Sequence, residues 1–191
     1  MNVTENQTFR YATVSVDGIH CNIQGFQNNA KQRSLYSFKA GTTTVKYQLA
    51  TQIDSGWITD VTGPFVGSVH DYSILIKSGL LDWLIPQEKI VCDAGYVGWE
   101  TEQLILQPIV NATTPEERLW NNTIAQVRIQ VERINSYIKK FRIMRMTYIK
   151  SIVLHGLAMR FICHMTNLRL LKYPSRAGVH PTLFDCTLQK P

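Results

Sequence analysis

The stretch Lys89-Ile90-Val91-Cys92-Asp93-Ala94-Gly95-Tyr96-Val97-Gly98 decides how the rest of this sequence is interpreted. Its short apolar run, from Ile90 to Cys92, is typical of a strand buried on both faces, as the strands of parallel sheets are. Asp93 follows directly, and Gly95 permits a sharp turn after it. Ligands of open α/β sheets bind where the strands end. Asp93 is therefore either a ligand-binding carboxylate or the polar cap of a turn.

Other strand signals surround this stretch. Residues 11–17 alternate apolar and polar side chains, which predicts a strand with Asp17 on the face opposite Val16 and with Gly18 at its end. Three more strands are predicted, the first two as a hairpin around Asp54-Ser55-Gly56: 43–51, 57–61 and 104–110. Residues 21–34 are predicted to be a loop, and the Gly-Pro segment 63–68 is expected to interrupt the strand pattern.

Helices are predicted over three segments: 69–84, 115–141 and 149–171. Ser68 is the expected N-cap of the first, and Thr114-Pro115 is a strong start signal for the second. Within the second, an apolar stripe predicts the buried face: Ile124, Val127, Val131, Ile134, Ile138 and Phe141. In the third, His155 and His164 are interpreted as core or rim histidines rather than as metal ligands.

The position of Glu132 follows from that stripe. It lies one residue, about 100 degrees, away from Val131, which places it at the edge of the packed interface, and Arg128 is one turn earlier on the same face. If the strands that carry Asp17 and Asp93 are neighbours, the helix brings Glu132 to the same end of the sheet.

Three clustered carboxylates repel one another unless a cation neutralises them. Oxygen ligands alone favour Mg²⁺ or Mn²⁺ over zinc, and a two-metal site supports phosphodiester cleavage. The alternative is three unrelated surface acids.

Length, composition and charge narrow the class of protein. The 191 residues, 45% of them hydrophobic, suit one α/β domain, and no run reaches the roughly 18 apolar residues of a membrane span. The four cysteines are widely spaced, so free thiols are expected.

Residues 1–117 carry 7 Lys and Arg against 12 Asp and Glu, whereas residues 118–191 carry 13 Lys and Arg against 2 Asp and Glu. A basic half predicts a polyanionic partner, nucleic acid first and an anionic membrane second. A merely solvated basic surface is the alternative.

Four short motifs occur in one order: Val16-Asp17-Gly18-Ile19-His20-Cys21, Gly67-Ser68-Val69-His70-Asp71, Cys92-Asp93-Ala94-Gly95-Tyr96 and Arg128-Ile129-Gln130-Val131-Glu132. In this order they resemble the DDE superfamily endonuclease domain of PIF/Harbinger-type transposases, over about residues 11–173. The resemblance implies an RNase H-like α/β fold, with a mixed sheet of about five strands flanked by helices. It also implies that Asp17, Asp93 and Glu132 are the catalytic, metal-binding triad, whose carboxyl groups should lie close enough to share one or two cations. His70, Asp71 and Arg128 match supporting positions of the family's motifs.

The resemblance further implies a nuclear, metal-dependent DNA endonuclease or transposase that hydrolyses phosphodiesters at transposon ends. The expected organisation is a disordered segment 1–10, a catalytic domain 11–173 and a tail 174–191. The family usually has a helix-turn-helix region before its first catalytic strand, and only about ten residues precede that strand here. The sequence is then a fragment, a domesticated form, or a chain to which a Myb/SANT-like partner delivers the DNA. A homo-oligomer is also left open.

Basic residues just beyond Glu132 are expected to contact the phosphate backbone: Lys139, Lys140, Arg142 and Arg145. The competing hypothesis is a domesticated, catalytically inactive DNA- or protein-binding module on the same fold. It predicts salt-dependent binding without turnover. An RNA-directed nuclease is a third, weaker alternative.

Overall fold

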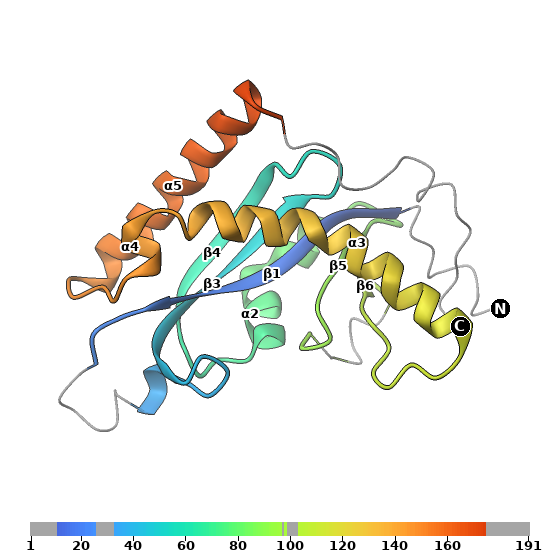
Figure 1. The fold of residues 1–191 in the computed structure, drawn as a ribbon, viewed down its shortest axis with the longest axis horizontal. Helices are drawn as coiled ribbons and strands as arrows, with labels where there is room; N and C mark the ends of the chain where they lie inside the picture. The colour runs from blue at the N-terminus through green and yellow to red at the C-terminus, as the bar shows by residue number, and fades with distance from the viewer. Residues whose placement is uncertain (1–10, 26–32, 97, 99–102, 175–191) are drawn as a thin grey trace.

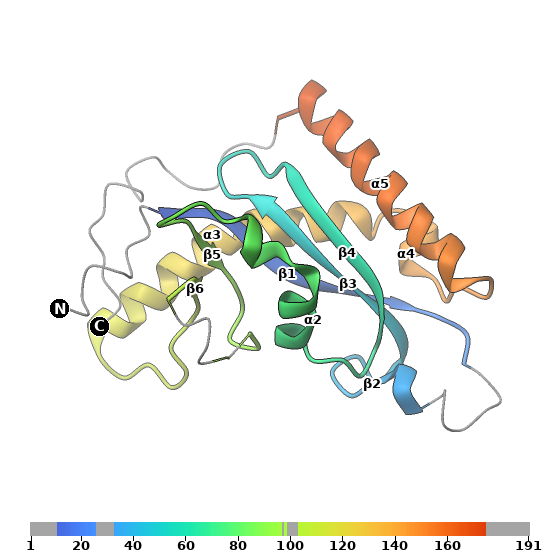
Figure 2. The same ribbon diagram turned by 180° about the vertical axis from the view of Figure 1, so that it is seen from behind.

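The computed structural model describes residues 11–25, 33–96, 98 and 103–174, so the predicted segment 1–10 and residues 175–191 of the predicted tail lie outside the described residues. A mixed sheet forms the centre of the molecule. The long helix α3 (Pro115–Ile138) crosses one face of the sheet, the short helix α2 (Asp71–Ser78) covers the other, and α5 (Ile152–Lys172) runs along β4 (Figures 1 and 2). In the described part of the chain, no helix is both long and apolar enough to cross a membrane.

Six strands form the sheet, in the order β2-β3-β1-β5-β6, with β4 also pairing with β3. Their bounds are β1 Ala12–Asn22, β2 Tyr36–Ser37, β3 Thr42–Gln52, β4 Ile58–Val66, β5 Lys89–Val91 and β6 Ile105–Leu106. β1 pairs antiparallel with β3 and parallel with β5, and β5 pairs parallel with β6. The expected RNase H-like arrangement of a mixed sheet between helices is confirmed, with six strands in place of about five because the two-residue β2 also joins β3.

Two strands are longer than the sequence predicts. β1 continues past Gly18 to Asn22, inside the predicted loop, because β3 pairs with it along this whole length. β4 continues through Gly63-Pro64 to Val66, where an interruption was expected. Within the part of the chain that the structure describes, β4 pairs on one side only, with β3, and the register between them shifts near Lys46. Proline is tolerated in such an edge strand because its missing N–H is not needed there.

The helix predicted over residues 69–84 is wrong in its extent, because the observed helix α2 spans only Asp71–Ser78. α2 begins at Asp71 with His70 at the N-cap position, and Ser68 does not cap it but donates its hydroxyl to the carbonyl of Ser34 at 2.7 Å. The helix ends at Gly79, whose φ of 70° is left-handed, and a separate 3₁₀ turn, η3 (Leu80–Trp83), follows. A left-handed residue terminates an α-helix, and glycine adopts that conformation without a steric penalty. The continuous helix predicted to residue 84 is therefore two elements.

The Thr114-Pro115 helix start is confirmed as α3. The Thr114 side chain accepts from the Glu117 amide and the Glu117 side chain accepts from the Thr114 amide, a reciprocal capping box. Five of the six stripe residues are buried, but Phe141 lies past the helix end and is 41% exposed. A four-residue helix, α4 (Arg142–Arg145), then leads to α5.

The core lies on both faces of the sheet. On the α3 and α5 side it includes Ile19, Tyr47 and Ile134. On the α2 side it includes Val16 and Leu75. Of the two α5 histidines, His155 is buried and hydrogen-bonds the Tyr47 hydroxyl at 2.7 Å, whereas His164 is exposed. Among the described cysteines, Cys21, Cys92 and Cys163 are buried free thiols, as expected, and Cys186 lies outside that part of the chain.

Candidate active site

Asp17 and Asp93 lie at neighbouring positions because of the parallel register between β1 and β5. Ser15 is paired with Val91, and the same step carried two residues further along each chain reaches Asp17 and Asp93. β5 ends at Val91, whereas β1 continues with β3 as its neighbour. Asp17 is therefore in the middle of its strand, not at its end as the sequence suggested. Asp17 lies where the neighbouring strand β5 has ended, so the sheet is open on that side of Asp17.

Helix α3 supplies the third carboxylate. Its buried residues Val127, Val131 and Ile134 lie against the sheet, which directs Arg128 toward the two aspartates. The Arg128 guanidinium forms ion pairs with all three acids: 3.5 Å to Asp93 Oδ1, 3.6 Å to Glu132 Oε1 and 3.9 Å to Asp17 Oδ1. The structure thus brings the predicted triad and Arg128 to one place.

The environment of the three acids becomes more solvated from Asp17 to Glu132. Their side chains are 19%, 36% and 56% exposed for Asp17, Asp93 and Glu132. Burial raises the pKa of Asp17 above its ordinary 3.8; the Arg128 charge opposes this shift and the Asp93 charge adds to it. Asn135, one turn after Glu132, donates its amide to Asp17 Oδ2 at 2.8 Å. The Asp17 carboxylate is therefore oriented by the hydrogen bond from Asn135 and by the ion pair with Arg128.

The expectation that the three carboxyl groups already lie close enough to share a metal ion is not met. In the residues that the structure describes, no group of three His, Cys, Asp or Glu side chains is close enough to hold an ion. Arg128 pairs with all three acids, so its guanidinium occupies space that a shared ion would need and offsets part of their negative charge. The donor set itself, three carboxylates around one positive group, suits Mg²⁺ or Mn²⁺.

His70 and Asp71 have different environments. His70 is exposed and its side chain makes no cap hydrogen bond. Asp71 pairs with Lys46, Nζ to Oδ1 at 3.1 Å, and the two side chains are only 8% and 14% exposed for Lys46 and Asp71. A Cβ atom added to Gly18 would lie 3.3 Å from Asp71 Oδ1. The Asp71–Lys46 pair therefore lies directly against the backbone that follows Asp17.

The four basic residues beyond Glu132 do not form one group. Lys139 donates to the carbonyls of His20 and Met144, so its ammonium is directed into the fold. Lys140, Arg142 and Arg145 are exposed, and Lys140 lies over the Tyr137 ring at 4.7 Å. Lys140 follows Glu132 by eight residues, about 12 Å along a helix. The exposed cations thus follow the C-terminal end of α3, on the segment that leads into α4.

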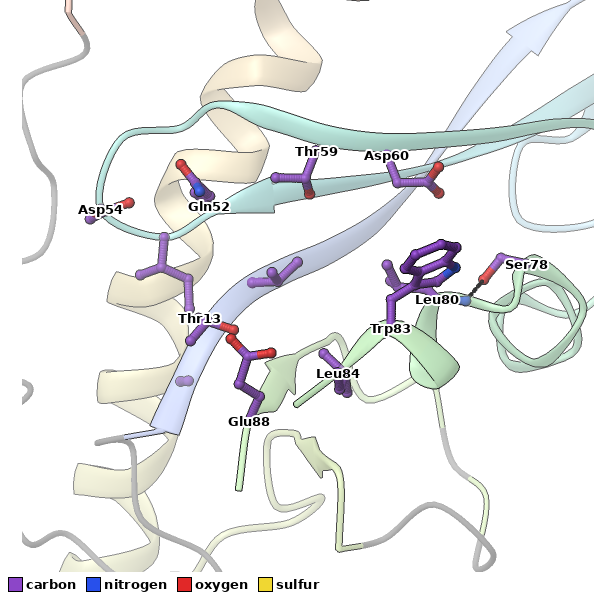
Figure 3. A pocket seen from close by; sticks show the side chains of 13 residues that line it. Thr13, Gln52, Asp54, Thr59, Asp60, Ser78, Leu80, Trp83, Leu84 and Glu88 are labelled. Carbon is purple, nitrogen blue, oxygen red and sulfur yellow. Dashed lines mark hydrogen bonds between the residues drawn. The ribbon is translucent and has the colours of Figure 1, made fainter. Parts of the chain in front are cut away.

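A cavity of about 790 Å³ lies apart from the acids, between the turn of the β3–β4 hairpin and η3 (Figure 3). Thr13, Asp60 and Trp83 are among the residues that line it, and none of the triad, nor Arg128, does so. The carboxylates lie instead at the border between core and surface, with Asp17 largely buried and Glu132 exposed. That position suits a long polymeric substrate better than an enclosed small molecule.

Sequence reasoning missed two residues of this region. Asn135 is three residues after Glu132 and seven after Arg128, a spacing that places all three on one face of a helix, so the signal was present. Lys46 is a single cation in the β3 pattern, where its neighbours in sequence gave no indication of a buried ion pair. Only the fold shows that its partner is Asp71.

Comparison with known proteins identifies a family and a relative that this chain resembles. The profile of the family described as DDE superfamily endonuclease matches residues 16–167. The chain is 29% identical over 123 residues to a protein described as "Probable transposase for insertion sequence element IS702" from Microchaete diplosiphon, a match that covers 61% of this chain and 43% of that protein. The chain spans less than half the length of this relative. No solved structure matches. Because the family profile extends over well more than half of the sequence, from the strand that carries Asp17 to helix α5, the chain belongs to the DDE superfamily endonucleases.

Proposed function

We propose that this chain is the catalytic domain of a metal-dependent DNA endonuclease or transposase that hydrolyses phosphodiester bonds at transposon ends. The observation that carries the proposal is the convergence of Asp17, Asp93 and Glu132 on the single cation of Arg128. Three carboxylates can supply the oxygen ligands of a divalent-metal phosphodiesterase site. The PIF/Harbinger subtype, a nuclear location and a Myb/SANT-like DNA-binding partner belong to the same proposal.

The three carboxylates would hold Mg²⁺ or Mn²⁺ once Arg128 leaves its place between them. When bound, such ions supply the charge that activates a water or a 3′-hydroxyl and stabilises the leaving oxygen. Asn135 keeps Asp17 in one orientation through its 2.8 Å hydrogen bond. Arg128 is long enough to transfer its guanidinium from the carboxylates to a substrate phosphate, a geometry for which arginine is well suited. Its role is then to offset part of the negative charge of the acids in the absence of DNA and to hold the phosphate in its presence.

The nucleic acid would lie along α3 toward α4. Lys140, Arg142 and Arg145 are exposed in this direction and would contact successive phosphates, with a binding constant that falls as salt increases. Lys139 would first have to release its ammonium from the carbonyls of His20 and Met144 to join them. His70 and Asp71 would support the site from the α2 side, Asp71 through its contact with the Gly18 backbone.

The test is cleavage of a duplex that carries the terminal repeats flanking the gene of this chain, with Mg²⁺. We expect cleavage by the wild-type protein and a loss of at least 100-fold for Asp93→Asn, because the carboxylate charge is needed to hold the metal. The matched control is Asp54→Asn, an exposed aspartate in the cavity of Figure 3, which should cleave as the wild type does. Equal activity of wild type and Asp93→Asn would reject the mechanism.

One observation favours a second candidate, an inactive DNA- or protein-binding module. Arg128 already pairs with all three acids, and among the described residues no three-ligand metal group exists. This candidate predicts DNA binding that weakens with salt, without cleavage in Mg²⁺ or Mn²⁺. Its binding should be unchanged in Asp93→Asn and weaker in a variant with Arg142 and Arg145 replaced by alanine.

A further inference from the structure

Helix α5 is apolar on two opposite faces. One face is buried in the fold, where it packs along β4 through residues such as Met159, Ile162 and Leu170. On the other face, seven apolar side chains are 41–71% exposed: Val153, Leu154, Leu157, Phe161, Met165, Leu168 and Leu171. Figures 1 and 2 show α5 at the border of the molecule, with its outer face turned away from the sheet. A helix that is apolar all round is normally buried all round, so this face is an interaction surface.

The exposed residues have the spacing of a helix–helix seam. Leu154, Leu157, Phe161, His164, Leu168 and Leu171 follow one another by 3, 4, 3, 4 and 3 residues, and all six are exposed. A stripe with this spacing is the a/d pattern of a coiled coil, in which each side chain inserts between residues of a facing helix. The occupant that fits is therefore another α-helix. Val153 and Met165, which are also apolar and exposed, lie at the two borders of this stripe and widen the apolar surface to about 120 degrees of the helix.

We infer that this face of α5 is a dimerisation surface and that it packs antiparallel against α5 of a second copy of the chain. In antiparallel pairing centred between Phe161 and His164, the seam is complementary to itself. Leu154 lies beside Leu171 of the second copy, Leu157 beside Leu168, and Phe161 beside His164. Every layer then combines one a position with one d position, and the central imidazole meets an aromatic ring rather than a second imidazole.

The charges on α5 select this orientation. The helix contains the basic residues Arg160, Arg169 and Lys172 and no acidic residue. In a parallel pair, Arg169 and Lys172 of both copies would gather at one end, and like charges that face each other are destabilising. In the antiparallel pair the two Lys172 side chains lie at opposite ends, each near Val153 of the other copy.

The size of the surface suits a stable dimer. At roughly 100 Å² exposed on each of the seven apolar side chains, α5 offers roughly 700 Å² per copy, close to the roughly 800 Å² per partner of a standard interface. Apolar patches of this size are uncommon on proteins that remain monomeric. This inference does not depend on the catalytic proposal, because the dimer forms whether or not the acids hold a metal.

The test is the mass of the full chain in solution by sedimentation equilibrium. We expect the wild type at twice 21.9 kDa and Leu157→Glu as a monomer at the same micromolar concentration, with its dissociation constant raised at least 100-fold. Since Leu157 is 59% exposed, the variant should keep the wild-type circular dichroism and melting temperature of the monomer. Val110→Glu, which replaces an apolar residue 67% exposed elsewhere, is the matched control and should remain dimeric.

Orientation is tested by cross-linking in a Cys186→Ser background. Leu157→Cys mixed with Leu168→Cys should form a disulfide-linked dimer, and neither variant alone should do so. A monomeric wild type, a Leu157→Glu variant that stays dimeric, or cross-linking of Leu157→Cys with itself would each overturn the proposal. So would flotation of a monomeric wild type with anionic vesicles, which would assign the face to a membrane surface.

Discussion

Removing the charge of Arg128 is the most informative perturbation of the candidate site. Arg128→Met keeps much of the apolar stem, which packs with the helix, and deletes the guanidinium that pairs with Asp17, Asp93 and Glu132. The three acids then face one another without a counter-ion. We expect the variant to be less stable without metal, and to regain stability when Mg²⁺ takes over the neutralising role.

The magnitude follows from the exposure of each pair. Asp93 and Glu132 are 36% and 56% exposed, so each of these pairs contributes at most about 0.5 kcal/mol. Asp17 and Arg128 are 19% and 15% exposed, and their pair, at 3.9 Å, contributes about 1 kcal/mol. The free energy of unfolding should fall by about 1.5–2 kcal/mol, which lowers the melting temperature by about 3–8 °C for a chain of this size.

The assay is thermal unfolding at pH 7 in EDTA and in excess Mg²⁺. Mg²⁺ should raise the melting temperature of Arg128→Met more than that of the wild type, because in the wild type the ion must first displace the guanidinium. Adding Asp93→Asn to the variant should abolish this gain. Arg145→Met, at an exposed position on α4, is the control and should change stability by less than about 0.5 kcal/mol. An unchanged melting temperature in EDTA, or an equal Mg²⁺ shift in wild type and Arg128→Met, would refute the reasoning.

Two further predictions concern the acids on either side of the sheet. Burial raises the pKa of Asp17 above 3.8, so ionisation of Asp17 lowers the stability of the folded protein once the pH rises past that value. The Asp17→Asn variant should therefore have a slightly higher melting temperature than the wild type at pH 7 and the same melting temperature at pH 3. It should also lose DNA cleavage. A lower melting temperature at pH 7 would contradict this. Lys46→Met leaves the Asp71 carboxylate, which is 14% exposed, without its cation, and should lower the free energy of unfolding by about 2–3 kcal/mol. Adding Asp71→Asn to this variant should restore part of the lost stability. If thermal melts show no restoration, the unpaired charge is not the cause of the loss.

Some features of this protein follow from local sequence alone. Thr114-Pro115 with Glu117 predicts where α3 begins because the cap, the proline and the acid act within one helical turn. Ile90 to Cys92 followed by Asp93 predicts a buried strand with a polar end because the alternatives would expose the apolar run. The apolar stripe of α3 likewise determined which face is buried and hence that Glu132 lies at its edge.

Other features were decided only by tertiary contacts. β1 reaches Asn22 because β3 pairs with it throughout, and β4 runs through Gly63-Pro64 because it is an edge strand; neither partner is visible in the local sequence. The position of Arg128 between the three acids depends on the register of β1 against β5 and on the crossing of α3, contacts between residues 35 to 111 positions apart. Local sequence determined which carboxylates are available and on which elements they lie, since periodicity and capping act over a few residues. The tertiary structure decided that one guanidinium pairs with all three of them, since those distances are set by the packing of the whole sheet and helix.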